Sequence, residues 1–221
     1  MTIFSPKRLP NKNSTVIAAT DAVPAEGSFA EEVRIAREES RRLQRFLDDL
    51  LQASRIEHGA VAPEWELVDP TDIINAVVRD LRQDSPGGRI ELALEEDCPL
   101  VRTDPVLLRH VLLNLVDNAL KYSGATDRVS IELRCADLYV ECRVLDRGPG
   151  LPAEPEALFE RFHRIVGSDR TGGSGLGLWI AKSFAEVLDC TLAACNREGG
   201  GALFTLSVPL ATTTSPGIAH A

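Results

Sequence analysis

The stretch Gly172-Gly173-Ser174-Gly175-Leu176-Gly177-Leu178 decides how the chain is expected to fold. Its glycines at alternate positions leave the backbone bare, so that N–H groups can approach a phosphate closely. The segment that follows, Leu178 to Leu188, has apolar residues at helical spacing and contains neither glycine nor proline. The loop is therefore predicted to open a helix, and a helix N-terminus favours a bound anion.

The loop alone does not decide the ligand, because glycine-rich turns that bind nothing are common. No Gly-Lys-Ser/Thr follows it, so it is not a Walker loop. It also lies late in the chain and outside a βαβ repeat, which argues against a dinucleotide-binding fingerprint. The upstream sequence has to distinguish a phosphate site from an ordinary turn.

Composition describes an ordinary globular protein and excludes several classes of function. The 221 residues are 44% hydrophobic and 26% charged, with a net charge of −9 and a pI of about 5.0. A chain this acidic is not expected to bind nucleic acid. It contains no run of about 18 apolar residues, so no membrane segment is predicted. Its start, Met1 to Pro10, lacks the apolar core of a signal peptide.

The cysteines indicate the cellular compartment in which the protein is expected to lie. There are five, which is an odd number, and they form no Cys-x-x-Cys pair. We interpret them as buried thiols in a reducing cytosol, so the predicted location is cytoplasmic. A bridge between Cys135 and Cys142 across a hairpin is the alternative.

Patterns of polarity divide the chain into four parts. Residues 1–27 are rich in proline and small polar residues and are expected to be irregular. Residues 28–59 repeat apolar positions at spacings of three and four and predict a long amphipathic helix. That helix either packs on its own domain or is half of a helical hairpin that dimerises. Residues 63–210 form the main domain, and 211–221 are a frayed tail.

Within the main domain, Asp69-Pro70 and Asp104-Pro105 each place an N-cap acid before a proline at the first helical position. Each predicts a helix, the second running to about Tyr122. Alternation of apolar and polar residues predicts strands at 89–94, 128–135, 138–145, 191–196 and 202–208.

The helix after Asp104 is apolar almost all round, but it carries one polar stripe. Asn114, Asn118 and Lys121 stand at i, i+4 and i+7 and share a face. Buried polar groups need partners. The stripe is therefore either satisfied within the fold or faces a ligand or a metal.

Asp146 ends the strand 138–145 and precedes the turn Arg147-Gly148-Pro149-Gly150. We interpret it as a carboxylate at the wall of a pocket; the alternative is an acid that caps its own turn. The segment 163–171 is polar and is followed by glycines, so it is predicted to form a mobile lid, with 163–173 the least ordered internal segment.

Four motifs now stand in a fixed order. They are Asn-x3-Asn-x2-Lys-Tyr (114–122), Asp-Arg-Gly-Pro-Gly (146–150), Leu-Phe-Glu-Arg-Phe (158–162) and Gly-Ser-Gly-Leu-Gly-Leu (173–178). Together they resemble the N, G1, F and G2 boxes of the ATP-binding domain of sensor histidine kinases, in the GHKL superfamily. Residues 37–59 resemble the second helix of that family's dimerisation domain. Leu-Val-Asp-Asn-Ala-Leu-Lys-Tyr-Ser and the ending Asn-Arg-Glu-Gly-Gly-Gly-Ala-Leu-Phe are similar to the Kdp-type potassium/turgor sensor kinases.

The resemblance implies a fold and two cofactors. The fold is a two-layer α/β sandwich of the Bergerat type, a mixed sheet covered by helices, preceded by the long amphipathic helix. The cofactors are ATP and Mg²⁺, and Asp146 would accept a hydrogen bond from the adenine amino group. Asn118, helped by Asn114, would hold Mg²⁺, and Lys121 would meet a phosphate. The other residues implied in nucleotide binding are Tyr122, Gly148, Gly150, Arg164, Gly173, Gly175, Leu176 and Gly177.

The implied function is that of the ATP-binding catalytic domain of a two-component sensor kinase, which transfers the γ-phosphate of ATP to a histidine. The chain departs from the family here, because none of His58, His110, His163 and His220 fits the position of the phosphoacceptor. Ser5 stands where the histidine would be in the segment Ser5 to Pro10. No catalytic residue is therefore assigned, and autophosphorylation of this chain alone is not expected.

Two functions remain open at this point. In the first, another chain supplies the histidine, so the expected partner is a response regulator or a histidine-bearing kinase, with weak homodimerisation through 28–59. In the second, the chain is a non-catalytic GHKL-fold regulator or a phosphotransfer-like scaffold that docks a response regulator or a kinase.

Overall fold

The structure, a computed structural model, describes residues 26–84, 89–163 and 174–210. The chain divides into two compact units, Met1–Gln44 and Arg45–Ala221. The described part of the first unit is the beginning of helix α1 (Glu26–Glu57). The second unit holds the end of α1 and all the elements that follow it.

A five-stranded mixed sheet forms the second unit, with the strand order β2-β4-β5-β7-β6. β2 and β4 are parallel, and the other neighbouring strands are antiparallel. All five correspond to strands that the alternation predicts. Their bounds are β2 (Ile90–Leu94), β4 (Val129–Cys135), β5 (Tyr139–Leu145), β6 (Thr191–Asn196) and β7 (Ala202–Pro209).

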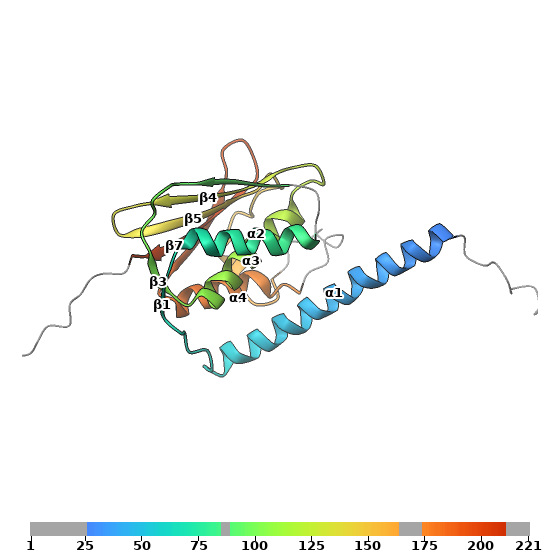
Figure 1. Cartoon of the computed structure of the whole chain (residues 1–221), viewed down its shortest axis with the longest axis horizontal. Coiled ribbons are helices and arrows are strands. Elements are labelled where there is room, and N and C mark those ends of the chain that lie inside the picture. The colour runs from blue at the N-terminus through green and yellow to red at the C-terminus, as the bar shows by residue number, and fades with distance from the viewer. Residues whose placement is uncertain (1–25, 85–88, 164–173, 211–221) are drawn as a thin grey trace, which may run out of the picture. The chain divides into compact units, whose positions relative to one another are not determined.

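Three helices, α2 (Pro70–Asp84), α3 (Pro105–Tyr122) and α4 (Gly177–Val187), lie together on one side of this sheet (Figure 1). The apolar core fills the space between the two layers, with Leu115, Phe184 and Phe204 almost fully buried. Along β5 and β7, every second residue points into this core. The expected two-layer α/β sandwich is confirmed.

Asp104 fixes the start of α3, as its place before a proline predicts. Its Oδ1 accepts hydrogen bonds from the backbone N–H groups of Val106 (2.8 Å) and Leu107 (3.0 Å). Its Oδ2 accepts from the N–H of Glu64 at 2.9 Å, in the segment that follows α1. One buried carboxylate therefore both caps the helix and ties down the connection from α1.

The second half of α1 has two apolar faces with different environments. Ala53 is fully buried, and Leu50 and Ile56 pack partly buried against the core of the domain. Leu47 and Leu51 are 51% and 63% exposed on the same half of the helix. None of the helices in the described ranges is long and apolar enough to cross a membrane.

Two short strands escaped the sequence analysis. β1 (Glu66–Val68) and β3 (Val101–Thr103) pair antiparallel as a separate two-stranded sheet. Three residues are too few for alternation to be recognised. A long-range contact supports the pair, because the guanidinium of Arg102 lies 4.9 Å from the centre of the Trp65 ring.

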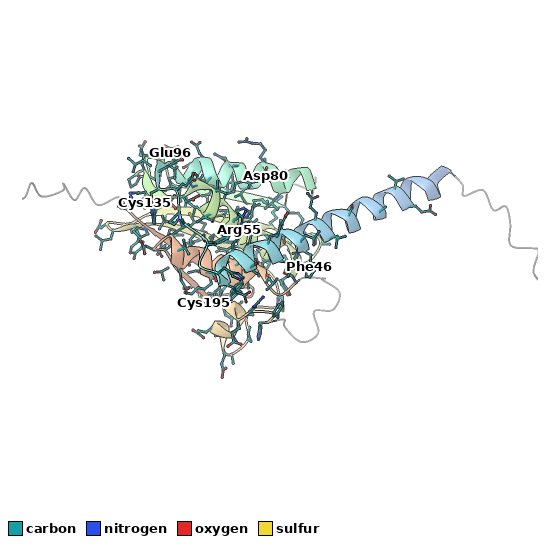
Figure 2. The ribbon with its side chains drawn as sticks, turned by 90° about the horizontal axis from the view of Figure 1, so that it is seen from below. Phe46, Arg55, Asp80, Glu96, Cys135 and Cys195 are labelled. Atoms are coloured by element: carbon teal, nitrogen blue, oxygen red, sulfur yellow. A yellow bond between two sulfur atoms is a disulfide. The ribbon has the colours of Figure 1, made fainter. Side chains whose placement is uncertain are left out.

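The interpretation of the cysteines as free thiols is wrong for two of them. Cys98 and Cys135 form a disulfide, with Cα atoms 5.7 Å apart. The parallel register sets Leu94 of β2 opposite Leu133 of β4, so the turn after β2 passes beside the end of β4. Figure 2 shows Cys135 and Glu96, which belongs to that turn, at the same end of the domain.

The alternative bridge between Cys135 and Cys142 does not form. The antiparallel register places Cys135 opposite Val140, whereas Cys142 stands opposite Leu133 and is fully buried. Burial raises the pKa of the Cys142 thiol to about 12.

Removing the disulfide is expected to destabilise the domain. A cross-link between residues 37 positions apart restricts the unfolded chain, so the double variant Cys98→Ser/Cys135→Ser should lose about 2–4 kcal/mol of unfolding free energy. Urea unfolding under non-reducing conditions measures this. The control Cys195→Ser removes an exposed free thiol and should change the unfolding free energy by less than about 0.5 kcal/mol. Equal stabilities of the two variants would contradict the prediction.

Candidate functional site

A cavity of about 360 Å³ lies beside α3, the start of α4 and the loop after β5. This volume falls in the range of small-molecule sites. Its lining comes from segments far apart in the sequence, including both asparagines of the polar stripe and the glycine loop. Of the twelve residues predicted to bind the nucleotide, eight line it: Asn114, Asn118, Lys121, Tyr122, Asp146, Gly150, Gly175 and Gly177.

The other four predicted residues differ in their positions. Gly148 follows Asp146 in the same turn and donates its N–H to that carboxylate. Leu176 is fully buried in the core. Arg164 and Gly173 lie outside the described residues, as does the predicted lid apart from His163, which lines the cavity.

The polar stripe of α3 faces the cavity and is longer than the sequence analysis assumed. Asn114 donates from Nδ2 to the backbone O of His110 at 3.2 Å, and Lys121 forms an ion pair with Asp117. His110 and Asp117 line the cavity as well. Both stand at helical spacing from the predicted stripe, so the same periodicity could have identified them.

His110 is held in an apolar setting although it lines the cavity. Its ring meets the ring of Phe184 edge to face, with centroids 6.1 Å apart. Burial lowers the pKa of its imidazole, and the positive charge of Arg109 lowers it further.

Asp146 is both a structural acceptor and part of the cavity wall. The residue is 3% exposed, and its Oδ1 accepts the N–H of Gly148 (2.8 Å) and the N–H of Ala202 (2.9 Å). Both readings of this residue from the sequence are therefore correct in part. Its Oδ2 has no donor among the described residues, which leaves this oxygen available to a ligand.

The start of α4 offers uncapped N–H groups to the cavity. Its N-cap, Leu176, has no side-chain hydrogen bond, and Gly177 lines the cavity. A β-carbon at Gly177 would lie 3.0 Å from Asn114 Oδ1, so glycine allows the helix start to approach the stripe of α3. The arrangement suits an anion, because donors and the helix dipole point to the same place.

Two carboxylates of α1, Asp48 and Asp49, also line the cavity, and the sequence analysis missed them. Asp49 accepts a hydrogen bond from the hydroxyl of Ser174 at 2.8 Å. Burial raises the pKa of Asp49, while the bond from Ser174 and the charge of Lys121 act to lower it. No local pattern marks these residues, because the contact joins positions 125 apart in the sequence.

The donor set fits a cation only with help from a ligand. The amide oxygens of Asn114 and Asn118 are of the kind that hard cations prefer. Within the described residues, no group of three or more His, Cys, Asp or Glu side chains could hold a metal ion. A cation here would therefore need further oxygens, such as those of a phosphate.

The described histidines do not offer an exposed helical nucleophile. His58 follows the end of α1, with Nδ1 2.7 Å from the backbone O of Ser54. His110 lies in the cavity on α3, and His163 follows the F-box motif. His220 lies outside the described residues.

Comparison with known proteins gives one consistent family. Residues 103–212 match the family described as histidine kinase-, DNA gyrase B-, and HSP90-like ATPases. The sensor protein KdpD of Escherichia coli is 32% identical over 171 residues, which are 76% of this chain and 19% of KdpD. The sensor-like histidine kinase SenX3 of Mycobacterium tuberculosis is 35% identical over 198 residues, 88% of this chain and 48% of SenX3. The chain thus spans less than half the length of these relatives.

A solved structure agrees in fold. Full-length ShkA, in complex with AMPPNP, superposes with a TM-score of 0.68 at 26% sequence identity, over 87% of this chain and 41% of that one. The similarity to KdpD confirms the Kdp-type resemblance of the motifs.

The sequence analysis also missed the role of Gly201, which is packed against the backbone of Asp146. A β-carbon there would lie 2.2 Å from the backbone O of Asp146, at a φ of +93°. We expect Gly201→Ala to lower the unfolding free energy by about 1–3 kcal/mol more than a matched substitution without a clash.

Gly200 provides that match, because its φ is +97° and a β-carbon there would meet nothing within 4 Å. Urea unfolding of Gly200→Ala and Gly201→Ala separates steric clash from backbone strain. Equal losses in the two variants would show that the approach to Asp146 is not the constraint.

Proposed function

Because the chain belongs, through residues 103–212, to the family of histidine kinase-, DNA gyrase B-, and HSP90-like ATPases, we propose that it transfers the γ-phosphoryl group of ATP to a histidine supplied by another chain. Its ATP-binding domain is that of sensor histidine kinases. The observation that carries the proposal is the cavity, which unites the polar stripe of α3, Asp146 and the glycine loop. The relatives are longer than this chain, so their similarity does not by itself assign phosphoryl transfer to this chain. That transfer is the step that we propose.

Asp146 would recognise adenine in this site. Its Oδ1 is occupied by two backbone donors, and its Oδ2 has no donor among the described residues. An ionised carboxylate accepts hydrogen bonds only, so Oδ2 suits the exocyclic amino group of adenine. Gly148 and Gly150 would shape the wall of the adenine site, and Tyr122 would border the nucleotide.

The polar stripe of α3 and the glycine loop would hold the phosphates. Asn118, with Asn114, would bind Mg²⁺ through amide oxygens, sharing the cation with the triphosphate. Lys121 would meet a phosphate as a point charge. Gly173, Gly175 and Gly177 would offer backbone N–H groups, and buried Leu176 would anchor their loop in the core. Arg164 would contact the γ-phosphate.

Bound Mg-ATP would supply the phosphoryl group, and its Mg²⁺ would balance part of the negative charge of the phosphates. This chain would bind and orient the nucleotide. The described residues fit that role, because the lining combines amide oxygens, an ammonium group and an uncapped helix N-terminus. The acceptor histidine would come from the partner, which we propose to be a histidine-bearing kinase, with a response regulator next in the relay. A cytoplasmic location is proposed from the need for ATP alone, because the Cys98–Cys135 disulfide removes the argument from free thiols.

Homodimerisation through residues 28–59 is proposed as well, and the exposed side chains of Leu47 and Leu51 on α1 support it.

A non-catalytic regulator or scaffold is the second candidate function. The observation that favours it is the position of the described histidines, because His58 lies beyond the end of α1 and His110 lies in the cavity. A regulator would still bind nucleotide but would not pass on the phosphoryl group. Adding labelled ATP with a histidine-bearing kinase as partner distinguishes the two functions.

The exchange Asp146→Asn tests adenine recognition without removing the structural acceptor. An asparagine oxygen can still accept from Gly148 and Ala202, but its NH2 group replaces the second oxygen and cannot accept. We expect the affinity for Mg-ATP, measured by calorimetry, to fall by about 1–3 kcal/mol. Inosine triphosphate has an oxygen in place of the amino group, so the same variant should lose less affinity for it. Absence of Mg-ATP binding by the unmodified protein would contradict the proposed function.

The purified chain alone is expected not to autophosphorylate on histidine. The transfer needs an imidazole nitrogen in line with the γ-phosphate, on an exposed position with a group that orients the ring. Incubation of the purified chain with radiolabelled ATP tests this directly. When a histidine-bearing kinase partner is added to the mixture, that partner should become labelled. An acid-labile, base-stable label on this chain would refute the prediction, and mapping it to His58 would identify the acceptor.

A further inference from the structure

A carboxylate of helix α1 contacts the glycine loop. Asp49 is partly buried, and its Oδ2 accepts a hydrogen bond from the hydroxyl of Ser174, with the two oxygens 2.8 Å apart. The same hydroxyl oxygen accepts the backbone N–H of Leu176 at 3.1 Å. Both hydrogen-bonding roles of Ser174 are thus used inside the protein, and its donor is directed to a negative charge.

This carboxylate shares the cavity lining with Lys121. Burial raises the pKa of Asp49, and the positive charge of Lys121 acts in the opposite direction. Asn114 and Gly177, which approach each other closely, line the same cavity. Asp49 is therefore a carboxyl group that lines the same cavity as the groups that the proposed function assigns to phosphates and Mg²⁺.

This inference rests on the proposed function. We propose that Asp49 is an intramolecular competitor for the phosphates of ATP: its carboxylate holds Ser174 of the glycine loop and lines the same cavity as the groups assigned to the phosphates. Nucleotide binding then requires α1 to release the glycine loop. Because coupling between two binding events is reciprocal, bound Mg-ATP weakens the hold of the domain on α1 to the same extent as α1 weakens ATP binding. The state of α1 would thereby set the nucleotide affinity.

Substitution of Asp49 gives the first test. In Asp49→Ala, the carboxylate and the hydrogen bond are both lost, and the affinity for Mg-ATP measured by calorimetry should rise about ten-fold, the scale of one hydrogen bond to a charged group. The matched control is Asp48→Ala, which removes the same side chain from the neighbouring residue that also lines the cavity but has no bond to Ser174. Its effect should be under about three-fold.

A probe without phosphates shows where the effect arises. The affinity for adenosine should be the same in Asp49→Ala and in the unmodified protein, because the proposed competition is with phosphates only. An equal gain for adenosine and for Mg-ATP would overturn the inference, as would equal gains in the variants of Asp48 and Asp49. Weaker Mg-ATP binding in Asp49→Ala would also overturn it and would identify Asp49 as a ligand of the cation.

Hydrogen exchange provides a second readout that does not depend on a variant. Addition of Mg-ATP to the unmodified protein should speed amide exchange in residues 46–57 of α1, because the bond to Ser174 is released. Unchanged or slower exchange there with nucleotide bound would contradict the competition. If neither the unmodified protein nor Asp49→Ala binds Mg-ATP, the proposed function fails together with this inference. If both bind it with equal affinity, the inference alone fails.

Discussion

The carboxylate of Asp146 is the constraint on which the site depends. It is 3% exposed, at the end of β5, and a buried charge is tolerated only with hydrogen-bond donors around it. Ala202, at the start of β7, donates one of them and Gly148 the other. The backbone of Asp146 is held as well, because its N–H donates to the O of Ala202 (3.0 Å) and its O accepts from Arg197 (3.1 Å). The charge thus binds the ends of two strands together and fixes one wall of the cavity.

Helix α3 has to satisfy two opposing requirements. Six of its side chains, including Leu112 and Leu115, are buried in the core between helices and sheet. The remaining face carries the polar stripe into the cavity, where Asn114 bonds to the backbone of its own helix and Lys121 pairs with Asp117. Such local partners satisfy the polar groups without filling the cavity. A helix that is anchored in this way keeps the stripe in place through core packing rather than through the ligand.

The sequence predicts those parts of the fold that depend on local patterns. Strands five to eight residues long, the N-cap acids and the stripe at i, i+4 and i+7 are all of this kind, and they account for the sheet, the helices and eight residues of the cavity. The missed features depend on contacts between distant segments. The Cys98–Cys135 disulfide needs the parallel register of β2 and β4, and β1 and β3 are too short to show alternation. Gly201 matters only because β7 returns beside Asp146.

The charge of the cavity restricts the form in which a nucleotide can bind. Among the described residues of its lining, five are aspartates, namely Asp48, Asp49, Asp80, Asp117 and Asp146, and Lys121 is the one ammonium group. Lys121 is itself paired with Asp117. Asp80 is likewise paired with the guanidinium of Arg109. Like charges disfavour one another where water is partly excluded, so the remaining carboxylates would repel an uncomplexed triphosphate. The N-terminus of α4, which has no side-chain cap, can offset part of this repulsion. Under the proposed function, a divalent cation would bring two further positive charges with the nucleotide. Asn118 and Asn114 would provide neutral oxygens for such a cation and add no further negative charge. Under the proposed function, the acidic lining would therefore make the cation part of the binding free energy of the nucleotide and not only of the chemistry. The carboxylate of Asp49 on α1, which is held by Ser174, contributes to this negative lining.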